Sequence, residues 1–394
     1  MSHKELFQLL IRGCRGDASA IRSVTNLQPA GGMGDKTFPP TYSGGAYAFE
    51  NRVIDGIRVR TVLLDSPQSQ ANRFEEVLLE SFRSGRLGIP VFEMKIPDHE
   101  AVTSLTAPHR VHDAILRDSS WDGKPFRESE HGKRLIAARS WNATAFFEYA
   151  PSVLLFGTWD SQGGGGVNTA KIARSLVSEV IAIDVEAGVR TSSRVDPLGI
   201  KLVQNVIVKT EDSAQWRFTE TADKKAKFMK PSEINHGNVT PSITNPEKGE
   251  PGGVTFREAV QTTVLSLTQL RRLKFPDASG KSSVERDAAG RAAISALGLF
   301  AVTLQQEEGY QLRSRCHLIP VERSEFELIG RTSKESEKFA VDSEMAEAAL
   351  KDAVAAASKL GLTWHSGLIE LQPRPDLLKL VAHSDKAMAA VQGE

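Results

Sequence analysis

The sequence predicts an α+β protein, in which hairpins and helices are segregated and two long insertions interrupt them. Three observations carry that prediction. A β-hairpin is readable at residues 47–64, an amphipathic helix begins near Gln68, and polar stretches at 93–144 and 200–255 separate the regular elements. Segregated elements favour an antiparallel sheet covered by helices over a regularly alternating parallel sheet.

The composition is that of an ordinary globular protein. The 394 residues are 40% hydrophobic and 25% charged, and 49 basic side chains balance 49 acidic ones. A neutral chain is not a nonspecific polyanion binder, so any nucleic-acid surface must come from local clusters of charge. Cys14 and Cys316 are too few for a disulfide framework, and we find no leader and no apolar run of about 18 residues. We therefore expect a reduced, cytoplasmic protein without a membrane segment.

The N-terminal region carries the clearest local signals. Residues 20–28 have the β-branched character of a strand, and residues 29–46 form a long loop rich in glycine and proline. The hairpin at 47–64 turns at Asp55 and Gly56, a pair suited to a type I′ turn. The helix that follows has its apolar stripe on Phe74, Val77, Leu78 and Phe82.

The remaining elements are less sharply marked. Residues 151–159 predict a buried strand, which a glycine run and a helix over 168–183 follow. A hairpin is expected within 200–218, and the polar, basic stretch 219–255 is typical of a projecting arm. Later elements are expected as helices at 256–274 and 287–297, an apolar run at 298–304 leading into strands up to residue 321, and an Ala-rich helix at 343–361.

The glycine run consists of Gly163, Gly164, Gly165 and Gly166. Bare backbone N–H groups beside a helix N-terminus favour an anion such as phosphate. A P-loop is disfavoured, because no Lys-Ser/Thr pair follows Gly166, and a flexible turn without a ligand stays open as an alternative. Donors suited to a phosphodiester nevertheless surround the run: Ser161, Gln162, Asn168, Lys171 and Arg174.

Three separated motifs resemble the backbone subunit of type I-G (earlier type I-U) CRISPR Cascade effector complexes, a branch of the repeat-associated RNA-binding superfamily. The motifs are DASAIRSVTNLQPAGGMGDKTFPPTY from Asp17, LLDSPQSQANRFEE from Leu63 and GTWDSQGGGGVNTAKIARSLVSEVI from Gly157. The similarity covers most of the chain between residues 14 and 320.

The resemblance implies a hand-shaped fold. Its palm would be of the RNA-recognition-motif, ferredoxin-like type, with a fingers insertion and a thumb that folds over the RNA. The segments map as palm at 1–92 with the loop 29–46, fingers at 93–144, palm again at 145–199, thumb or arm at 200–255, and palm completion with C-terminal helices at 256–394.

The resemblance also implies a function in antiviral defence. Several copies would form a helical filament along one guide RNA (crRNA), holding its phosphates without sequence preference for recognition of target DNA. Further implied partners are the large subunit, the crRNA-end-capping and crRNA-processing subunit, and a recruited helicase-nuclease, with no membrane, cofactor or metal. A neutral subunit suits this role, because a filament sums the field of many copies.

Candidate contact residues follow from the resemblance and from the chemistry of phosphate. In wider backbone families a Ser-Gln pair and a following basic residue contact guide-RNA phosphate at the first palm helix, and Ser69, Gln70 and Arg73 match that pattern. Since any spacer must be accepted, contacts to phosphate rather than to base edges are expected. The further candidates are Arg22 and Asn26 on the first strand, Lys36 in the early loop, and Lys224, Lys225 and Lys227 in the arm, where target DNA is an equal alternative.

Enzymatic alternatives rest on weaker signals. Asp35 in the early loop invites comparison with RNA-cleaving backbone subunits, where a carboxylate assists a metal-dependent attack on phosphate. A nucleotide-using enzyme would instead employ Gly163 to Gly166. His109, His112 and Asp113 have a spacing that can hold a metal, but no strong further ligand is evident. We therefore expect a binding subunit without catalytic residues.

Overall fold

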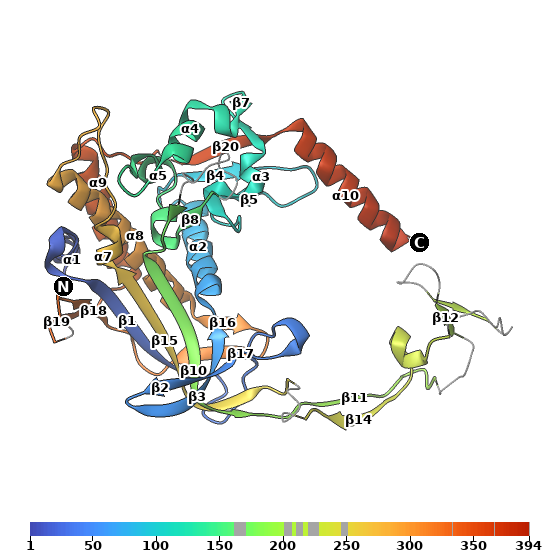
Figure 1. The fold of residues 1–394 in the computed structure, drawn as a ribbon. Coiled ribbons are helices and arrows are strands. Elements are labelled where there is room, and N and C mark those ends of the chain that lie inside the picture. The colour runs from blue at the N-terminus through green and yellow to red at the C-terminus, as the bar shows by residue number, and fades with distance from the viewer. Residues whose placement is uncertain are drawn as a thin grey trace. The chain divides into compact units, whose positions relative to one another are not determined.

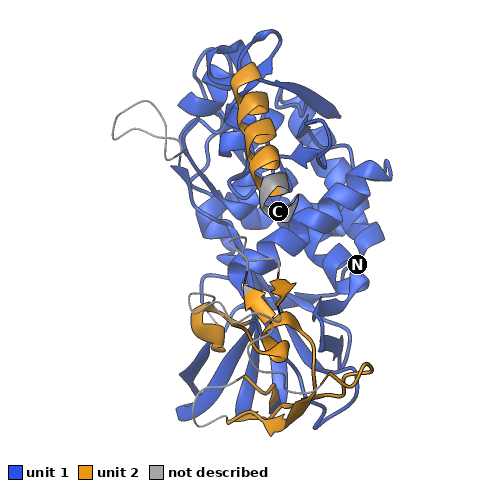
Figure 2. Cartoon of the chain, turned by 90° about the vertical axis from the view of Figure 1, so that its right-hand side faces the viewer, with its two compact units in different colours: residues 1–40, 48–185, 255–374 blue, residues 41–47, 186–254, 375–394 orange. Residues whose placement is uncertain are grey.

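The computed structural model describes residues 1–160, 171–200, 207–209, 216–219, 228–245, 251–332, 334–365 and 367–393. The chain divides into two compact units (Figures 1 and 2). Unit 1 comprises residues 1–40, 48–185 and 255–374, and unit 2 comprises residues 41–47, 186–254 and 375–394. Helices and antiparallel strands occur together, which confirms the α+β class.

A nine-stranded sheet forms the main layer of unit 1. Its strands are β1 (Ala20–Pro29), β2 (Phe49–Ile54), β3 (Ile57–Asp65), β10 (Leu176–Ala187), β15 (Val254–Ser266), β16 (Tyr310–Arg313), β17 (Cys316–Pro320), β18 (Phe326–Ile329) and β19 (Ser336–Phe339). Their order is β16-β17-β1-β15-β10-β3-β2, with β18 paired to β1 and β19 paired to β18 (Figure 1). Strand β1 pairs antiparallel with β15, β17 and β18.

Helices bury one face of this sheet. Along β1, Ile21 and Leu27 are buried, whereas Arg22, Val24 and Asn26 are exposed, so the alternation of the strand divides a core face from an open face. The helices that accompany the nine-stranded sheet are α1 (His3–Arg12), α2 (Pro67–Arg83), α7 (Leu267–Leu270), α8 (Val284–Glu308) and α9 (Ser343–Lys359), with a π-helical turn at Gly13–Asp17. Helix α8 lies at the centre of this layer and contacts α1, α2 and α9.

Helix α8 is the one helix in the described part of the chain that is long and apolar enough to cross a membrane. Its presence corrects the expectation that the sequence holds no such apolar run. Within the apolar window, 94% of the residues are buried inside the protein, as in a core helix.

A five-stranded sheet forms a second layer of unit 1. Its strands are β4 (Val91–Met94), β5 (Val102–Thr103), β6 (Ser119–Trp121), β7 (Lys124–Pro125) and β20 (Leu368–Pro373), in the order β5-β4-β20-β6-β7. Strand β20 pairs parallel with β4, so a C-terminal segment completes a sheet begun near residue 91. The helices of this region are α3 (Ala114–Arg117), α4 (Glu130–Ala137), α5 (Thr144–Tyr149) and α6 (Val153–Phe156), with 3₁₀ turns at Arg110–His112 and Phe126–Glu128.

Unit 2 consists of short strands and one terminal helix. Strands β11 (Thr191–Arg194) and β14 (Val239–Ile243) pair antiparallel, as do β12 (Ile207–Lys209) and β13 (Trp216–Phe218). The latter pair confirms the hairpin expected within 200–218. Helix α10 spans Pro375–Gly393, and 3₁₀ turns lie at Ser43–Gly45 and Pro231–Ile234.

Several predicted elements are confirmed. The first strand appears as β1, and the β2–β3 hairpin turns at Asp55 and Gly56 with φ of 50° and 79°, as a type I′ turn requires. The helix after Asp65 appears as α2, with the side chain of Ser66 capping its first turn by accepting the N–H of Ser69. The expected helices near 287 and 343 appear as α8 and α9, and the expected strands up to residue 321 as β16 and β17.

Four segments differ from the prediction. Residues 151–159 form helix α6 and a short strand rather than a buried strand, and the helix expected over 168–183 is replaced by strand β10. Residues 256–274 form β15 and α7 rather than one helix, and the run 298–304 belongs to α8. In β10 and β15 the apolar residues fit both periods, but β-branched side chains and pairing partners in a central sheet favour the strand.

Candidate nucleic-acid interface

A two-stranded ladder carries the glycine run. Strands β8 (Thr158–Trp159) and β9 (Lys171–Ile172) pair antiparallel, with Thr158 opposite Ile172 and Trp159 opposite Lys171. Ser161, Gln162, Gly163 to Gly166 and Asn168 lie between these strands and outside the described residues. Because the chain then enters β10, the helix dipole invoked for a phosphate at this loop is absent from residues 171–187, and that part of the prediction is wrong.

Gly157 fixes the start of the ladder. Its φ of 78° lies in the left-handed region, and a Cβ there would come within 3.1 Å of both the Arg174 nitrogen and the Ile172 carbonyl oxygen. A side chain at this position would be strained and would clash with backbone. Glycine therefore allows β8 and the chain around Arg174 to approach closely.

A basic pocket of about 260 Å³ opens beside the ladder. Its lining residues are Pro108, His109, Arg110, Phe156, Gly157, Thr158, Trp159, Lys171, Ile172 and Arg174. Arginine, lysine and histidine are present among these residues, and carboxylates are not. The pocket lies wholly within unit 1 and offers an electropositive surface to an anion.

A buried ion pair holds Arg110, one of the residues that line the pocket, in place. Arg110 Nε lies 2.6 Å from Glu75 Oε1 and its Nη2 lies 2.8 Å from Oε2, a bidentate pair with both side chains largely buried. Arg110 Nη1 also donates to the Gly157 carbonyl at 3.2 Å. Burial raises the pKa of Glu75 above its ordinary value, and the Arg110 guanidinium opposes that rise. The pair thus positions the start of the β8–β9 ladder, which is the stem of the glycine-rich loop, while its two charges neutralise each other.

Arg174 is the half-buried cation of the pocket. Its Nε donates to the Phe156 carbonyl at 3.2 Å and its Nη1 donates to the Pro67 carbonyl at 3.0 Å, so main-chain oxygens hold the guanidinium in place. Within the described residues no carboxylate forms an ion pair with it. Burial lowers the pKa of Arg174, the positive charge of Arg110 lowers it further, and Glu75 opposes both. An anion in the pocket would relieve this unfavourable environment.

His112 is buried beneath the ladder. Its Nδ1 lies 2.9 Å from the Thr158 hydroxyl, and its buried Nε2 has no hydrogen-bond partner among the residues that the structure describes. Burial lowers the pKa of His112 to about 4, and the charge of Asp160 opposes that shift. The imidazole is therefore neutral near pH 7.

The proposed metal ligands do not assemble. Asp113 accepts the N–H groups of Ile115 and His109 at 2.9 and 3.0 Å, and so caps helix α3. His112 is bonded to Thr158 instead. Among the residues that the structure describes, no group of three or more His, Cys, Asp or Glu side chains is placed to hold a metal.

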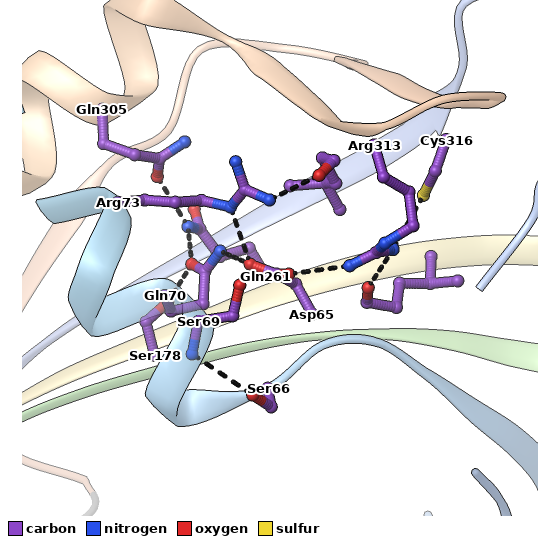
Figure 3. Close-up of polar contacts among 12 residues, drawn as sticks. Asp65, Ser66, Ser69, Gln70, Arg73, Ser178, Gln261, Gln305, Arg313 and Cys316 are labelled. Carbon is purple, nitrogen blue, oxygen red and sulfur yellow. Dashed lines mark hydrogen bonds and ion pairs between the residues drawn. The ribbon is translucent and has the colours of Figure 1, made fainter. Parts of the chain in front are cut away.

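Gln70 belongs to the core of unit 1 (Figure 3). Its side chain is fully buried, its Nε2 donates to Asp65 at 2.7 Å, and its Oε1 accepts from Ser178 at 2.9 Å and from Gln261 at 2.7 Å. Gln261 in turn donates to Gln305 and accepts from Tyr310. An amide engaged in this way cannot reach a phosphate at the surface, so the structure corrects the interpretation of Gln70 as a phosphate contact.

Arg73 and Ser69 also serve the start of α2. Arg73 Nε lies 2.9 Å from Asp65 Oδ2, and its Nη2 donates to the Leu312 carbonyl at 2.6 Å (Figure 3). The N–H of Ser69 donates to Ser66 in the cap of the helix. Both residues have structural partners here, and contacts of Arg73 and Ser69 with RNA stay predictions.

The candidates on β1 and in the early loop lie apart from the pocket lining. Arg22 is exposed and pairs with Glu327 at 2.5 Å, and Asn26 lies on the same exposed face. The backbone N–H of Lys36 donates to Asp35 at 2.8 Å. Lys224, Lys225 and Lys227 fall outside the described residues. In the basic pocket the structure brings together Lys171 and Arg174, whereas Arg22 and Asn26 line a separate pocket.

Sequence reasoning missed three residues of this site. Glu75 and Arg110 are separated by 35 positions and meet only through the fold. Trp159 is 58% exposed, and its place in the motif GTWD, two residues before the polar donors and glycines, was the available signal.

The structure thus defines an α+β protein with a basic pocket at the stem of a glycine-rich loop. Residues 21–187 match the family described as CRISPR-associated protein GSU0053. This segment holds most of the first motif and all of the other two, so the resemblance of the chain to a CRISPR-associated family is confirmed.

Comparisons with solved structures and with curated proteins add no further support for the family. The crystal structure of Csc2 from Thermofilum pendens is similar at 13% sequence identity over 90% of this chain and 80% of that chain. The TM-score is 0.29, too low to support an inference about geometry or function. No curated protein matches the chain.

The amide network yields a stability prediction. Gln261→Leu would remove the donor to the buried Oε1 of Gln305, the acceptor of the Tyr310 hydroxyl and one of the two donors to Gln70 Oε1, so we expect the free energy of unfolding to fall by about 2–4 kcal/mol. Urea unfolding measures the loss. Gln311→Leu, at an exposed position on β16, should change stability by no more than about 0.5 kcal/mol. Equal effects of the two substitutions would contradict the network.

His112 yields a pH prediction. Its folded pKa of about 4 lies below the ordinary 6.5, so the unfolded chain binds the proton more tightly and this group destabilises the fold as pH falls through that window. Protonation of His112 should lower the free energy of unfolding by up to roughly 3 kcal/mol, which corresponds to the difference between the two pKa values. The charges of Arg127 and Arg139 lower the folded pKa together with burial, and the charge of Asp160 raises it. Thermal melts from about pH 7 down to pH 5 should show a weaker pH dependence for His112→Asn, which can still bond Thr158. Parallel pH profiles would disprove the assignment.

Proposed function

We propose that the protein is the guide-RNA-binding backbone subunit of a type I-G CRISPR Cascade complex, acting in the cytoplasm without catalysis. The match of residues 21–187 to a CRISPR-associated family carries the proposal. That segment includes β1 from its second residue onward, α2, both strands of the β8–β9 ladder and Arg174.

The strand order supports a palm of the RNA-recognition-motif type. Strands β17, β1, β15 and β10 are neighbours in that order, α2 lies between β1 and β10 in the sequence, and α8 lies between β15 and β17. A β-α-β-β-α-β unit with spatial order 4-1-3-2 has this arrangement. The hairpin β2–β3 and the β12–β13 region of unit 2 are then additions to the palm, with the latter acting as the thumb.

The basic pocket supports contacts with phosphate. Arg174 is held by main-chain oxygens, and Lys171 lies across the ladder from Trp159, so both cations are available to an anion. Contacts of this kind carry no sequence information, as a subunit that accepts any spacer requires. Copies would assemble along the crRNA with the other Cascade subunits and expose it to target DNA, and the arm lysines would add contacts to RNA or DNA.

Expression with and without a CRISPR array tests this function. We expect the particle mass and the ratio of absorbance at about 260 to 280 nm to rise only when the array is present, because assembly requires guide RNA. Asp35→Ala should leave the length of the bound RNA unchanged. An RNA-free monomer under both conditions would refute the proposal, and RNA shortened only by proteins that retain Asp35 would favour the nuclease alternative.

The pocket has its own test. A double substitution, Lys171→Ala with Arg174→Ala, should weaken binding of single-stranded RNA and lower the slope of log affinity against log salt by about 1 to 2, because two phosphate contacts are lost. Filter binding at several salt concentrations measures both quantities.

A matched variant controls for charge. Lys351→Ala with Lys359→Ala on α9 removes the same number of positive charges at two exposed positions, and neither residue lines the pocket. We expect this variant to bind RNA with nearly the slope of the original protein. Identical losses in the two double variants would mean that net charge, rather than the pocket, governs binding.

A further inference from the structure

We propose that Trp159 and Lys171 form a stacking shelf for one base of a bound single-stranded RNA, while Lys171 and Arg174 hold the adjacent phosphate. The inference rests on the proposed function and adds to it a contact that phosphate binding alone does not require. The aromatic side chain would bind a base, whereas the cations of this surface would contact only the backbone of the RNA.

The exposure of Trp159 is built into the fold. The side chain is 58% exposed, whereas Thr158 beside it is 8% exposed and bonded to the buried His112. Successive residues of a strand point to opposite faces, so the Thr158–His112 contact directs the indole outward. The carbonyl of Gly157, which accepts from Arg110, fixes the strand from its other end. An exposed indole on a fixed strand presents its ring to solvent, as stacking on a base requires.

Lys171 completes the shelf. It is the cross-strand partner of Trp159, and directly opposed residues lie on the same face of a ladder. Its Nζ lies 5.6 Å from the centroid of the indole ring, within the range of a cation–π contact. Within the described residues no carboxylate pairs with Lys171, so its charge is available to a phosphate at the rim of the ring.

The pocket provides the place for that phosphate. Trp159, Lys171 and Arg174 line the same volume of about 260 Å³, with Arg174 held toward it by two carbonyl oxygens. An indole next to two cations matches the alternation of base and phosphate along a single strand. Stacking tolerates every base because each presents a π-face, so the shelf does not compromise the acceptance of any spacer.

Binding of a labelled oligouridylate of about 12 nucleotides to the full chain tests the shelf. We expect Trp159→Ala to weaken binding by about tenfold at fixed salt, and Trp159→Phe to stay within about threefold of the original affinity, since phenylalanine retains a ring. Trp141→Ala is the matched control, because Trp141 is 69% exposed and does not line the pocket. It should leave the affinity unchanged.

Fluorescence supplies a second measurement. RNA should quench tryptophan emission in the original protein and in Trp141→Ala, and much less in Trp159→Phe, even though that variant still binds. This result distinguishes stacking of the indole on RNA from a structural role of Trp159. It tests the shelf even if Trp159→Ala has a lower melting temperature and its loss of binding could come from a destabilised fold.

The outcomes separate the shelf from the proposed function. If the original protein binds RNA and Trp159→Ala binds equally well, or if quenching persists in Trp159→Phe, the shelf is wrong and the RNA-binding function stands. If Trp159→Ala weakened binding of a single-stranded oligodeoxythymidylate but not of the oligouridylate, the assignment of the shelf to RNA would be wrong. If the original protein binds no RNA, alone or with a CRISPR array, the function fails and the shelf fails with it.

Discussion

The fully buried carboxylate of Asp65 is the interaction on which the rest of the structure depends. Its Oδ2 accepts from Gln70 and Arg73 and its Oδ1 from Arg313, so one side chain at the end of β3 ties helix α2 to the β16–β17 hairpin. A buried charge is tolerated only when it is paired and hydrogen-bonded in this way. Helix α2 then presents the Pro67 carbonyl to Arg174 and Glu75 to Arg110, and Arg110 supports the stem of the glycine loop. The basic pocket is thus organised from the core outward.

This arrangement reconciles a neutral chain with the proposed role on nucleic acid. The ion pairs at Asp65 and at Glu75 consume several arginines inside unit 1, where they position elements rather than bind ligands. Beside the β8–β9 ladder, Lys171 and Arg174 have no carboxylate partner within the described residues and form a local cluster that is available to an anion. The motif residues around Gln70 therefore deserve a different interpretation in this chain, in which they build the support for a contact surface and need not form the surface itself.

The sequence alone predicts those parts that local chemistry determines. The Asp55-Gly56 turn and helix α2 are set by neighbouring residues, and both are present in the structure. Of the predicted stripe of α2, Phe74 and Leu78 are buried, and Val77 and Phe82 are half-buried. Strands β10 and β15 were expected as helices, because their apolar spacing fits both periods and only their central place in the sheet distinguishes them. Lys171 and Arg174 were found through the glycine motif. The pairing of Glu75 with Arg110 and the parallel joining of β20 to β4 depend on contacts remote in sequence, which no local pattern reveals.

The most direct test of the account is an experimental structure of the assembly that this protein forms with its guide RNA. The account predicts that in each copy a phosphate of the RNA lies within hydrogen-bond distance, about 3 Å, of the Arg174 guanidinium, while Gln70 stays buried and bonded to Asp65. An assembly whose RNA runs over another surface and leaves this pocket to solvent, or in which the Gln70 amide binds RNA directly, would contradict it.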